Sequence, residues 1–315
     1  MPFVTAFYRA LGTGMVISAD SPIDDKVRSA MESLIEDYEH VLSRFRNDSL
    51  IAAIGKAEHG GSFDFPDWCA PLFDLYDALF SATSGAIDPC VGEDLIRLGY
   101  DASLSFTVTQ DAPEHLGALR GRAVWGRDVT RHGTTLVTHE PVQLDFGACG
   151  KGYLVDLLGR MLQSSQFVID AGGDLLIHAE QPISVALEDP EDQSHAIGIA
   201  HIANGALCAS APSRRHWNVA VNERTQIAIH HLLNAIDGLP AQQTEASWAY
   251  VPANATLNLA RDYPTAVADG LATALFVSDV AQLQRTFDFT YATLDESRQI
   301  AVSRNFPAEL FLRSA

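Results

Sequence analysis

Short apolar runs separated by turn signals fill the chain between residues 134 and 229. Gly172-Gly173 and Asn204-Gly205 each lie between two such runs, which is the strongest short-range indication of a β-hairpin. The predicted strands are residues 14–18, 134–137, 142–146, 167–170, 175–178, 183–187, 197–202, 206–209, 217–221 and 227–229. Antiparallel pairing is therefore expected to dominate the second half of the chain.

Helical periodicity precedes and interrupts these runs. Apolar residues recur at helical spacing along residues 27–42, a second helix is predicted for residues 67–82 before Gly85, and a third begins near Gly152. This alternation is too irregular for a doubly wound parallel sheet. The sequence predicts an α+β fold with a mixed, largely antiparallel sheet and flanking helices. No linker or charge block divides residues 1–315, so one unit is expected, with two intimate lobes as the alternative.

The charge balance limits the partners of this chain. A formal net charge of −19 repels nucleic acid and anionic membrane surfaces, so neither is an expected partner. Four cysteines without a C-x-x-C pair indicate buried thiols rather than a zinc site or a disulfide framework. The N-terminal stretch lacks a signal-peptide pattern and no apolar run reaches membrane-spanning length, which favours the cytoplasm unless the sequence is trimmed.

A glycine-rich bend connects a predicted strand to a predicted helix at residues 144–153, Leu-Asp-Phe-Gly-Ala-Cys-Gly-Lys-Gly-Tyr. Such a bend can expose backbone N–H groups to a phosphate, and Lys151 would add a positive charge. The glycine spacing and the absence of a hydroxyl after the lysine exclude a Walker A loop. Taken alone, the bend is more often a structural turn than a binding site.

A second candidate site lies in a predicted helix at residues 267–276. Asp269 and Thr273 are four residues apart, on the face opposite Val267 and Leu271. A carboxylate and a hydroxyl so placed can bind a hard cation such as Mg²⁺. Helix geometry alone, however, favours an ordinary solvated face.

Two further segments carry polar groups next to turns. In residues 84–89 an aspartate precedes a proline, where an Asx-turn is the common explanation. His230 and His231 begin the other segment, and a partly buried polar pair is the simpler interpretation there. Neither segment indicates a site by itself.

Taken in order, these segments resemble the FAD:protein FMN transferase (ApbE) family over nearly the whole chain. The similar elements are Leu11-Gly12-Thr13-Gly14, residues 42–49, Gly85-Ala86-Ile87-Asp88-Pro89, residues 145–156, the Gly172-Gly173-Asp174 turn, Glu188-Asp189-Pro190 and residues 268–276. Two regions depart from the family pattern. Residues 209–214 replace T-S-G-x-x-R with Ala-Ser-Ala-Pro-Ser-Arg, and residues 231–238 keep the histidine and the final glycine but lose Asp, Pro and Thr.

The resemblance implies a T-fold-like sheet and a defined site. The metal would be Mg²⁺, held by the carbonyl of Ala148, the carboxylate of Asp269 and the hydroxyl of Thr273. The residues that would line the FAD pocket are Leu11, Phe45, Ala86, Ile87, Asp88, Asp145, Lys151 and Leu233. The implied partners are FAD and an acceptor flavoprotein with a modifiable Ser or Thr.

The implied reaction transfers FMN from FAD to that hydroxyl and releases AMP. Cleavage of the pyrophosphate builds negative charge that a metal ion stabilises. The acceptor proton would pass to the catalytic candidates Asp269 or His231. Two alternatives remain open at this level: an Mg²⁺-dependent FAD pyrophosphatase with the same site, and a non-catalytic FAD-binding protein.

Overall fold

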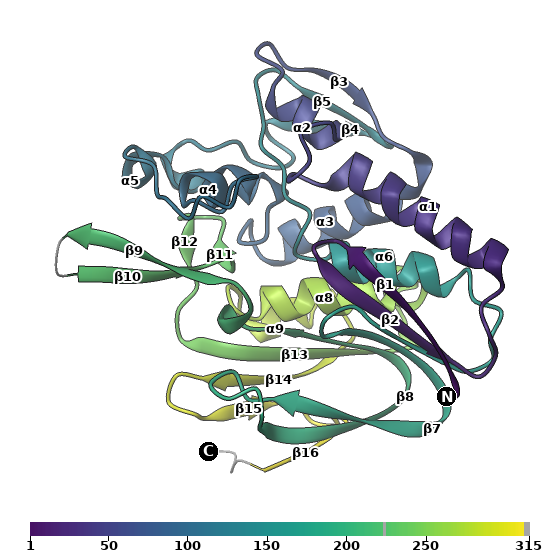
Figure 1. Cartoon of the computed structure of the whole chain (residues 1–315). Helices are drawn as coiled ribbons and strands as arrows, with labels where there is room; N and C mark the ends of the chain where they lie inside the picture. The colour runs from purple at the N-terminus through teal and green to yellow at the C-terminus, as the bar shows by residue number, and fades with distance from the viewer. Residues whose placement is uncertain (223–224, 312–315) are drawn as a thin grey trace.

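The computed structural model describes residues 1–222 and 225–311 and is built around a nine-stranded sheet (Figure 1). The strands follow the order β1 (Phe3–Ala10), β2 (Thr13–Ala19), β6 (Phe167–Asp170), β7 (Asp174–Glu188), β8 (Ala196–Ser210), β13 (Thr244–Pro252), β14 (Thr290–Asp295) and β15 (Ile300–Val302), and β16 (Ala308–Leu310) pairs with β8. Each of these pairings is antiparallel. The predicted α+β fold with a largely antiparallel sheet and flanking helices is confirmed.

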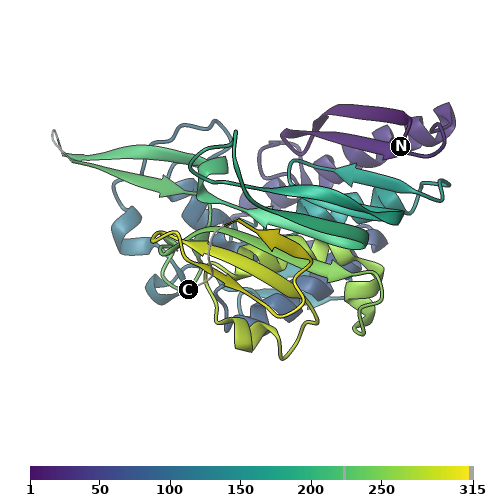
Figure 2. The same cartoon turned by 90° about the horizontal axis from the view of Figure 1, so that it is seen from below.

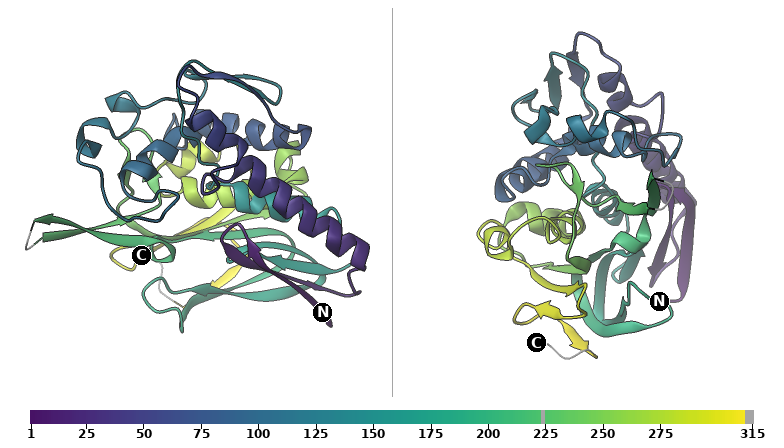
Figure 3. Two further views of the ribbon diagram at one scale, coloured as in Figure 1. Left: turned by 45° about the horizontal axis from the view of Figure 1, so that its top comes forward. Right: turned by 90° about the vertical axis from the view of Figure 1, so that its left-hand side faces the viewer.

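Four longer helices lie in layers over one face of this sheet (Figure 3). α6 (Gly150–Gly159) and α8 (Pro264–Ala274) pack on the sheet, and α1 (Asp25–Leu42) and α3 (Ala70–Ala82) pack over them. The apolar periodicity that predicted a helix over residues 27–42 corresponds to the buried face of α1, which contains Met31, Ile35, Tyr38 and Leu42. No helix in the described ranges is long and apolar enough to cross a bilayer.

Shorter elements surround these layers. The short helices are α2 (Leu50–Gly55), α4 (Gly92–Arg97), α5 (Ala112–His115), α7 (Asn258–Asp262) and α9 (Val280–Leu283), with 3-10 turns η1 (Asp67–Cys69), η2 (Pro89–Val91), η3 (Ala118–Arg120) and η4 (Pro212–Arg214). A small sheet contains β3 (Gly61–Asp64), β5 (Thr135–Thr138) and β4 (Val129–His132), and two hairpins contain β9 (His216–Asn222) with β10 (Thr225–His230) and β11 (Leu233–Asn234) with β12 (Leu239–Pro240).

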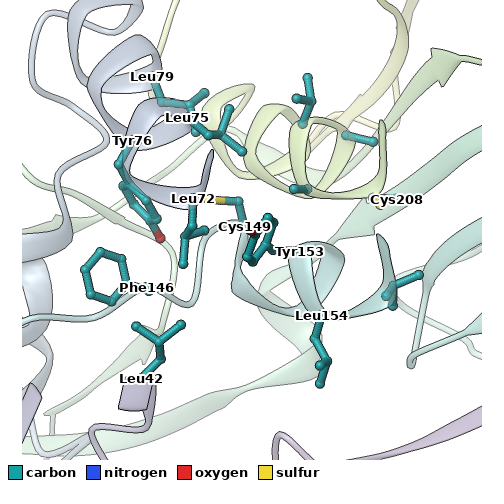
Figure 4. Close-up of a cluster of buried hydrophobic side chains, with 14 of the residues drawn as sticks. Leu42, Leu72, Leu75, Tyr76, Leu79, Phe146, Cys149, Tyr153, Leu154 and Cys208 are labelled. Carbon is teal, nitrogen blue, oxygen red and sulfur yellow. The ribbon is translucent and has the colours of Figure 1, made fainter. Parts of the chain in front are cut away.

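The largest hydrophobic core lies between the sheet and the helices. Figure 4 shows part of it, where side chains of α3 and α6 surround the thiol of Cys149. Cys69, Cys90, Cys149 and Cys208 are all free and buried, as the cysteine spacing predicts. A separate core is formed by side chains from β7, β8, β13, β14 and β15.

The β9–β10 hairpin projects from the body of the protein (Figure 2). Its base packs on the α4 and α5 segments through a small third core of Leu95, Leu98, Ala112, Leu116, Trp217, Ile229 and Leu233. The indole N–H of Trp217 donates to the carbonyl oxygen of Leu98 at 2.9 Å. The base of the hairpin is therefore fixed to the α4 region.

The predicted hairpin at Asn204-Gly205 is wrong, because both residues lie inside the continuous strand β8. Gly205 has φ +131°, and a side chain there would collide with the carbonyl oxygen of Val251 on β13. The glycine thus permits close approach of a neighbouring strand. The Gly172-Gly173 hairpin between β6 and β7 is confirmed, with φ values of +71° and +105°.

The strand predicted for residues 142–146 is also wrong. Val142, Leu144 and Phe146 are buried, so the alternation of apolar residues is real, but the segment joins no sheet. The N–H of Asp145 instead donates to the carbonyl oxygen of Pro89 at 2.7 Å. An extended segment can bury alternate side chains without belonging to a ladder of strands.

The start of α8 is fixed by a carboxylate from α6. Asp156 is buried, and its two oxygens accept the N–H groups of Thr265 at 3.1 Å and Ala266 at 2.8 Å. These are first-turn amides that the helix itself cannot satisfy. Next to them, a side chain at Gly152 would collide with the backbone of Thr265, so the two helices meet at backbone distance.

We predict that Asp156→Ala lowers the free energy of unfolding by about 2–4 kcal/mol, because two buried amides lose their acceptor. Urea denaturation followed by circular dichroism measures the loss. Asp24→Ala is the matched control, since Asp24 caps the exposed start of α1 by accepting the N–H of Lys26 at 2.8 Å. Its expected loss is about 0.5–1 kcal/mol. Equal losses in the two variants would contradict the role assigned to Asp156.

Candidate active site

The glycine-rich bend begins at Asp145 and leads into the first turn of α6. Cys149 is fully buried in the core below the bend, and the hydroxyl of Tyr38 donates to the carbonyl oxygen of Gly150 at 2.7 Å. The bend is therefore fixed by the packing of Cys149 and by the hydrogen bond from Tyr38. It places Lys151 against α8.

Asp269 lies in the middle of α8 and is 1% exposed. The helix is buried from Pro264 to Ala272, so the solvated face expected for Asp269 is wrong. The reason is that α8 lies between the sheet and α3, and both sides exclude water. Thr273 is partly exposed, and its hydroxyl oxygen lies 3.5 Å from the carbonyl oxygen of Ala148.

Lys151 joins two buried carboxylates. Its ammonium Nζ lies 3.2 Å from Oδ1 of Asp269 and 2.8 Å from Oδ2 of Asp174. The N–H of Gly152 donates to Oδ2 of Asp269 at 3.0 Å. The Lys151 side chain is 36% exposed while each aspartate side chain is 2% exposed, so the lysine links the buried acids to the surface.

Asp174 was not among the predicted site residues. It follows the Gly172-Gly173 turn, whose two N–H groups donate to Oδ1 of Asp170 at 3.0 and 3.1 Å. The turn brings Asp174 beneath the lysine. The signal in the sequence was an acidic residue directly after the two glycines, but its partner could not be identified without the fold.

Electrostatics couple these three groups. Burial raises the pKa of Asp269, and the neighbouring charge of Asp174 raises it further. Burial acts to lower the pKa of Lys151, but the carboxylates of Asp174 and Asp269 outweigh it and raise that pKa. Two carboxylates and one ammonium leave the cluster with a formal charge of −1 when all are ionised.

The predicted metal ligands form an all-oxygen set of one carboxylate, one hydroxyl and one carbonyl. Mg²⁺ prefers such oxygen ligands and commonly needs few from the protein. The hydroxyl of Thr273 and the carbonyl of Ala148 are close enough to contact one cation, and Asp269 precedes Thr273 by one helical turn. Within residues 1–222 and 225–311, no cluster of three His, Cys, Asp or Glu side chains forms another type of metal centre. The residues present fit Mg²⁺.

Asp145 lies at the other end of the bend and forms an ion pair with Arg44. The Arg44 guanidinium lies over the rings of Phe45 and Tyr100, 4.2 and 4.6 Å from their centroids. Phe45 and Asp145, both predicted to line the ligand pocket, are therefore close together through Arg44.

Leu11 lies at the turn between β1 and β2, and its N–H donates to Oε1 of Glu39 at 2.9 Å. Next to it is a shallow hollow with a volume of about 360 Å³, which is lined by Tyr8, Gly12, Thr13 and Glu39. This hollow does not include Lys151 or Asp269. Thr13 nevertheless lies next to the Gly172 turn, since a side chain at Gly172 would meet its hydroxyl, and this turn leads to Asp174 of the lysine cluster.

The segment from Ala86 to Asp88 is buried. Asp88 forms an ion pair with the buried Arg122 at 3.4 Å and caps η2 by accepting the N–H of Cys90 at 2.8 Å. Both contacts give Asp88 a structural role. Contact with a ligand in this segment would therefore come mainly from its backbone.

Leu233 lies beside that segment, because the N–H of Ala235 donates to the carbonyl oxygen of Ala86 at 3.1 Å. Leu233 is buried in the small core under β9 and β10. The ring of His231 is half-buried, and its Nδ1 lies 3.1 Å from the carbonyl oxygen of Arg215. Because a carbonyl only accepts, Nδ1 carries the proton and Nε2 is the basic nitrogen. Burial lowers the pKa of His231 to about 4.

Comparisons with known proteins show the family and the fold of this chain. The model of the ApbE family matches residues 11–293. A FAD:protein FMN transferase from Treponema pallidum is 27% identical over 286 residues, which are 80% of this chain and 72% of the relative.

Two solved structures share the fold. The ApbE protein of Thermotoga maritima superimposes with a TM-score of 0.79 at 20% identity, over 98% of this chain and 99% of its own. The flavin transferase ApbE of Vibrio cholerae gives 0.75 at 17% identity, over 96% and 97%.

We predict that Lys151→Met lowers the free energy of unfolding by about 3–5 kcal/mol, because two buried carboxylates lose their cation. Adding Asp174→Asn removes one of these charges and should restore part of the loss. Urea denaturation of the two single variants and the double variant measures this coupling. Lys56→Met is the control, since the Lys56 ammonium donates to the carbonyl oxygen of Asn47 on the surface. Purely additive losses would mean that Lys151 does not compensate Asp174.

Proposed function

Because the chain belongs to the ApbE family, we propose that it is a magnesium-dependent FAD:protein FMN transferase. It moves the FMN half of FAD to a Ser or Thr hydroxyl of an acceptor flavoprotein and releases AMP. The names of the Treponema and Vibrio relatives support this activity. The observation that carries the proposal is the ammonium of Lys151 between Asp174 and Asp269, next to the oxygens of Ala148 and Thr273.

A divalent cation is needed at this place for a simple electrostatic reason. The cluster of Lys151, Asp174 and Asp269 has a formal charge of −1 and would repel a pyrophosphate. Ala148, Asp269 and Thr273 would hold Mg²⁺, which would reverse that sign and supply positive charge to stabilise the pyrophosphate. Lys151 then donates to a phosphate oxygen from its exposed side.

The remaining pocket residues orient the dinucleotide. Arg44 holds Asp145 near Phe45, and the N–H of Asp145 donates to the carbonyl oxygen of Pro89 at 2.7 Å, next to residues 86–88. Leu233 lies close to the same segment, because the N–H of Ala235 donates to the carbonyl oxygen of Ala86. Their positions follow from hydrogen bonds between neighbouring segments rather than from one element. Such preorganisation supplies much of the rate enhancement in a phosphoryl transfer.

In the transfer step, the acceptor oxygen attacks the phosphorus of the FMN half, and the bond to the AMP oxygen breaks. The hydroxyl proton passes to a protein base. Asp269, whose pKa is raised by burial, and the free Nε2 of His231 are the two candidates. Of these, His231 is neutral at neutral pH but only weakly basic.

The residues that depart from the family pattern after His231 still form a closed turn. Oδ1 of Asn234 accepts the N–H of Ile236 at 3.0 Å, and the N–H of Gly238 donates to the carbonyl oxygen of Asn234 at 2.7 Å. Oδ1 of Asp237 accepts a further hydrogen bond from the N–H of Leu239 at 3.0 Å. The altered residues therefore leave the turn closed, but their loss of the family pattern still favours a non-catalytic FAD-binding protein. The complete set of Ala148, Lys151, Asp269 and Thr273 favours a catalytic one.

The proposal predicts an FMN-sized mass gain on an acceptor protein incubated with this enzyme, FAD and Mg²⁺. Mass spectrometry locates the modified Ser or Thr, and chromatography measures an equal amount of AMP. EDTA should abolish both products. FMN and AMP released without a labelled acceptor would instead identify a pyrophosphatase, and binding without any product would identify a non-catalytic protein.

Thr273→Val tests the metal site separately. It keeps the shape of the side chain but removes one oxygen ligand, so we expect the Mg²⁺ concentration for half-maximal turnover to rise about tenfold or more. Excess Mg²⁺ should restore the rate, whereas it should not rescue Lys151→Met in the Asp174→Asn background. Thr138→Val is the control, because within the described residues that buried hydroxyl has no hydrogen-bond partner and lies on β5. An unchanged Mg²⁺ requirement in Thr273→Val would remove Thr273 from the ligand set.

A further inference from the structure

We propose that the free edge of β1 and the neighbouring face of α1 form a groove that binds an extended, neutral or basic segment of the acceptor protein, which adds as a further strand beside β1. This inference rests on the proposed function and names the surface by which the acceptor reaches the site. We call this surface the edge groove. It is lined by Ala6, Phe7, Tyr8, Gly12 and Thr13 of the first hairpin and by Arg28, Glu32, Ile35, Glu36 and Glu39 of α1.

β1 lies at the end of the nine-stranded sheet (Figure 2). Among the described residues it pairs with β2 alone, so the backbone N–H and C=O groups that point away from β2 have no strand partner. Proteins usually protect such an edge with charged residues, with proline or by keeping the strand short. This strand has eight residues, and residues 3–8, Phe-Val-Thr-Ala-Phe-Tyr, contain neither a charge nor a proline. An unprotected edge is typical of strands that pair with a partner.

Two adjoining hollows lie between this edge and α1. One has a volume of about 360 Å³, and the other has a volume of about 260 Å³. Tyr8 lines both of them and is 87% exposed. Phe7 and Ile35 are almost fully buried and give the second hollow an apolar floor. The two hollows therefore follow β1 at the place where an added strand would lie.

The edge groove leads toward the lysine cluster. The turn after β1 brings Thr13 next to Gly172, where an added side chain would meet the Thr13 hydroxyl oxygen at 3.0 Å. The glycine turn continues to Asp174, which pairs with Lys151 at 2.8 Å. Both carboxylates of the cluster are 2% exposed, so the site is recessed. A narrow extended segment can carry a hydroxyl into such a recess, whereas a flat protein surface cannot.

The charge of the edge groove favours one kind of segment. Arg28 pairs with Glu32 at 3.2 Å, and Arg46, which is not part of the lining, pairs with Glu36 at 3.0 Å. Together with Glu39, the lining has three acidic residues and one basic residue, a formal charge of −2. It therefore attracts a neutral or basic segment and repels an acidic one. A second copy of this chain, with a net charge of −19, is disfavoured for the same reason.

Hydrogen–deuterium exchange with mass spectrometry tests the addition of a strand. The probe is the acceptor protein identified by its FMN-sized mass gain, with the modified Ser or Thr replaced by Ala so that it binds without reacting. We expect the probe to slow exchange of the β1 amides about tenfold or more. The amides of β15, at the other end of the sheet, should exchange at an unchanged rate. Protection of β1 that rises with enzyme concentration in the absence of the probe would identify a second copy as the occupant and overturn the proposal.

Steady-state kinetics test the side chains of the edge groove. We expect Tyr8→Ser to raise the KM for the acceptor about five- to tenfold and to leave kcat and the affinity for FAD unchanged. Val302→Ser is the control, since Val302 is an exposed apolar residue on β15. Glu36→Lys should raise the same KM, whereas Asp37→Lys, an equal change of charge at an exposed residue outside the lining, should not. Thermal unfolding checks that all four variants remain folded.

The outcomes separate the edge groove from the proposed function. An unchanged KM for the acceptor in Tyr8→Ser, or a β1 strand that the probe does not protect, overturns the edge groove while the proposed function stands. A weaker affinity for FAD in Tyr8→Ser also overturns it, because Tyr8 would then belong to the FAD site. Failure of the wild-type enzyme to transfer FMN to any acceptor overturns the proposed function and the edge groove with it.

Discussion

Neither Asp174 nor Asp269 could be buried at low cost without the ammonium of Lys151 between them. Asp174 begins β7, Asp269 lies in α8, and Lys151 lies in α6, so one ion-pair cluster connects the sheet with both inner helices. The same cluster leaves a net negative charge beside the oxygens of Ala148 and Thr273. The ion-pair cluster therefore also forms one wall of the site that we propose for Mg²⁺.

The backbone around this cluster fixes the position of α6 relative to α8. Gly152 allows α6 to contact α8 at backbone distance, and Asp156 holds the first amides of α8. Both residues belong to the motif that contains Lys151. A site built on two helices fixed in this way keeps its side chains in place more firmly than a site on loops.

Much of the fold could be predicted from local patterns. The periodicity of residues 27–42 and the turn at Gly172-Gly173 depend on neighbours in the sequence, and both predictions were confirmed. The burial of Asp269 could not be predicted, because it depends on Lys151 and Asp174 from distant segments. The same limit explains Gly205, whose need for glycine comes from the approach of β13.

The position of β6 between β2 and β7 has a consequence for how the protein is made. β2 pairs with β1 on one side and with β6 on the other, where Ile17 is opposite Ile169. At ordinary rates of translation, β6 emerges from the ribosome on the order of ten seconds after β2. During that time the N-terminal hairpin has an unpaired strand edge, which is a site where nascent chains associate wrongly and where chaperones act.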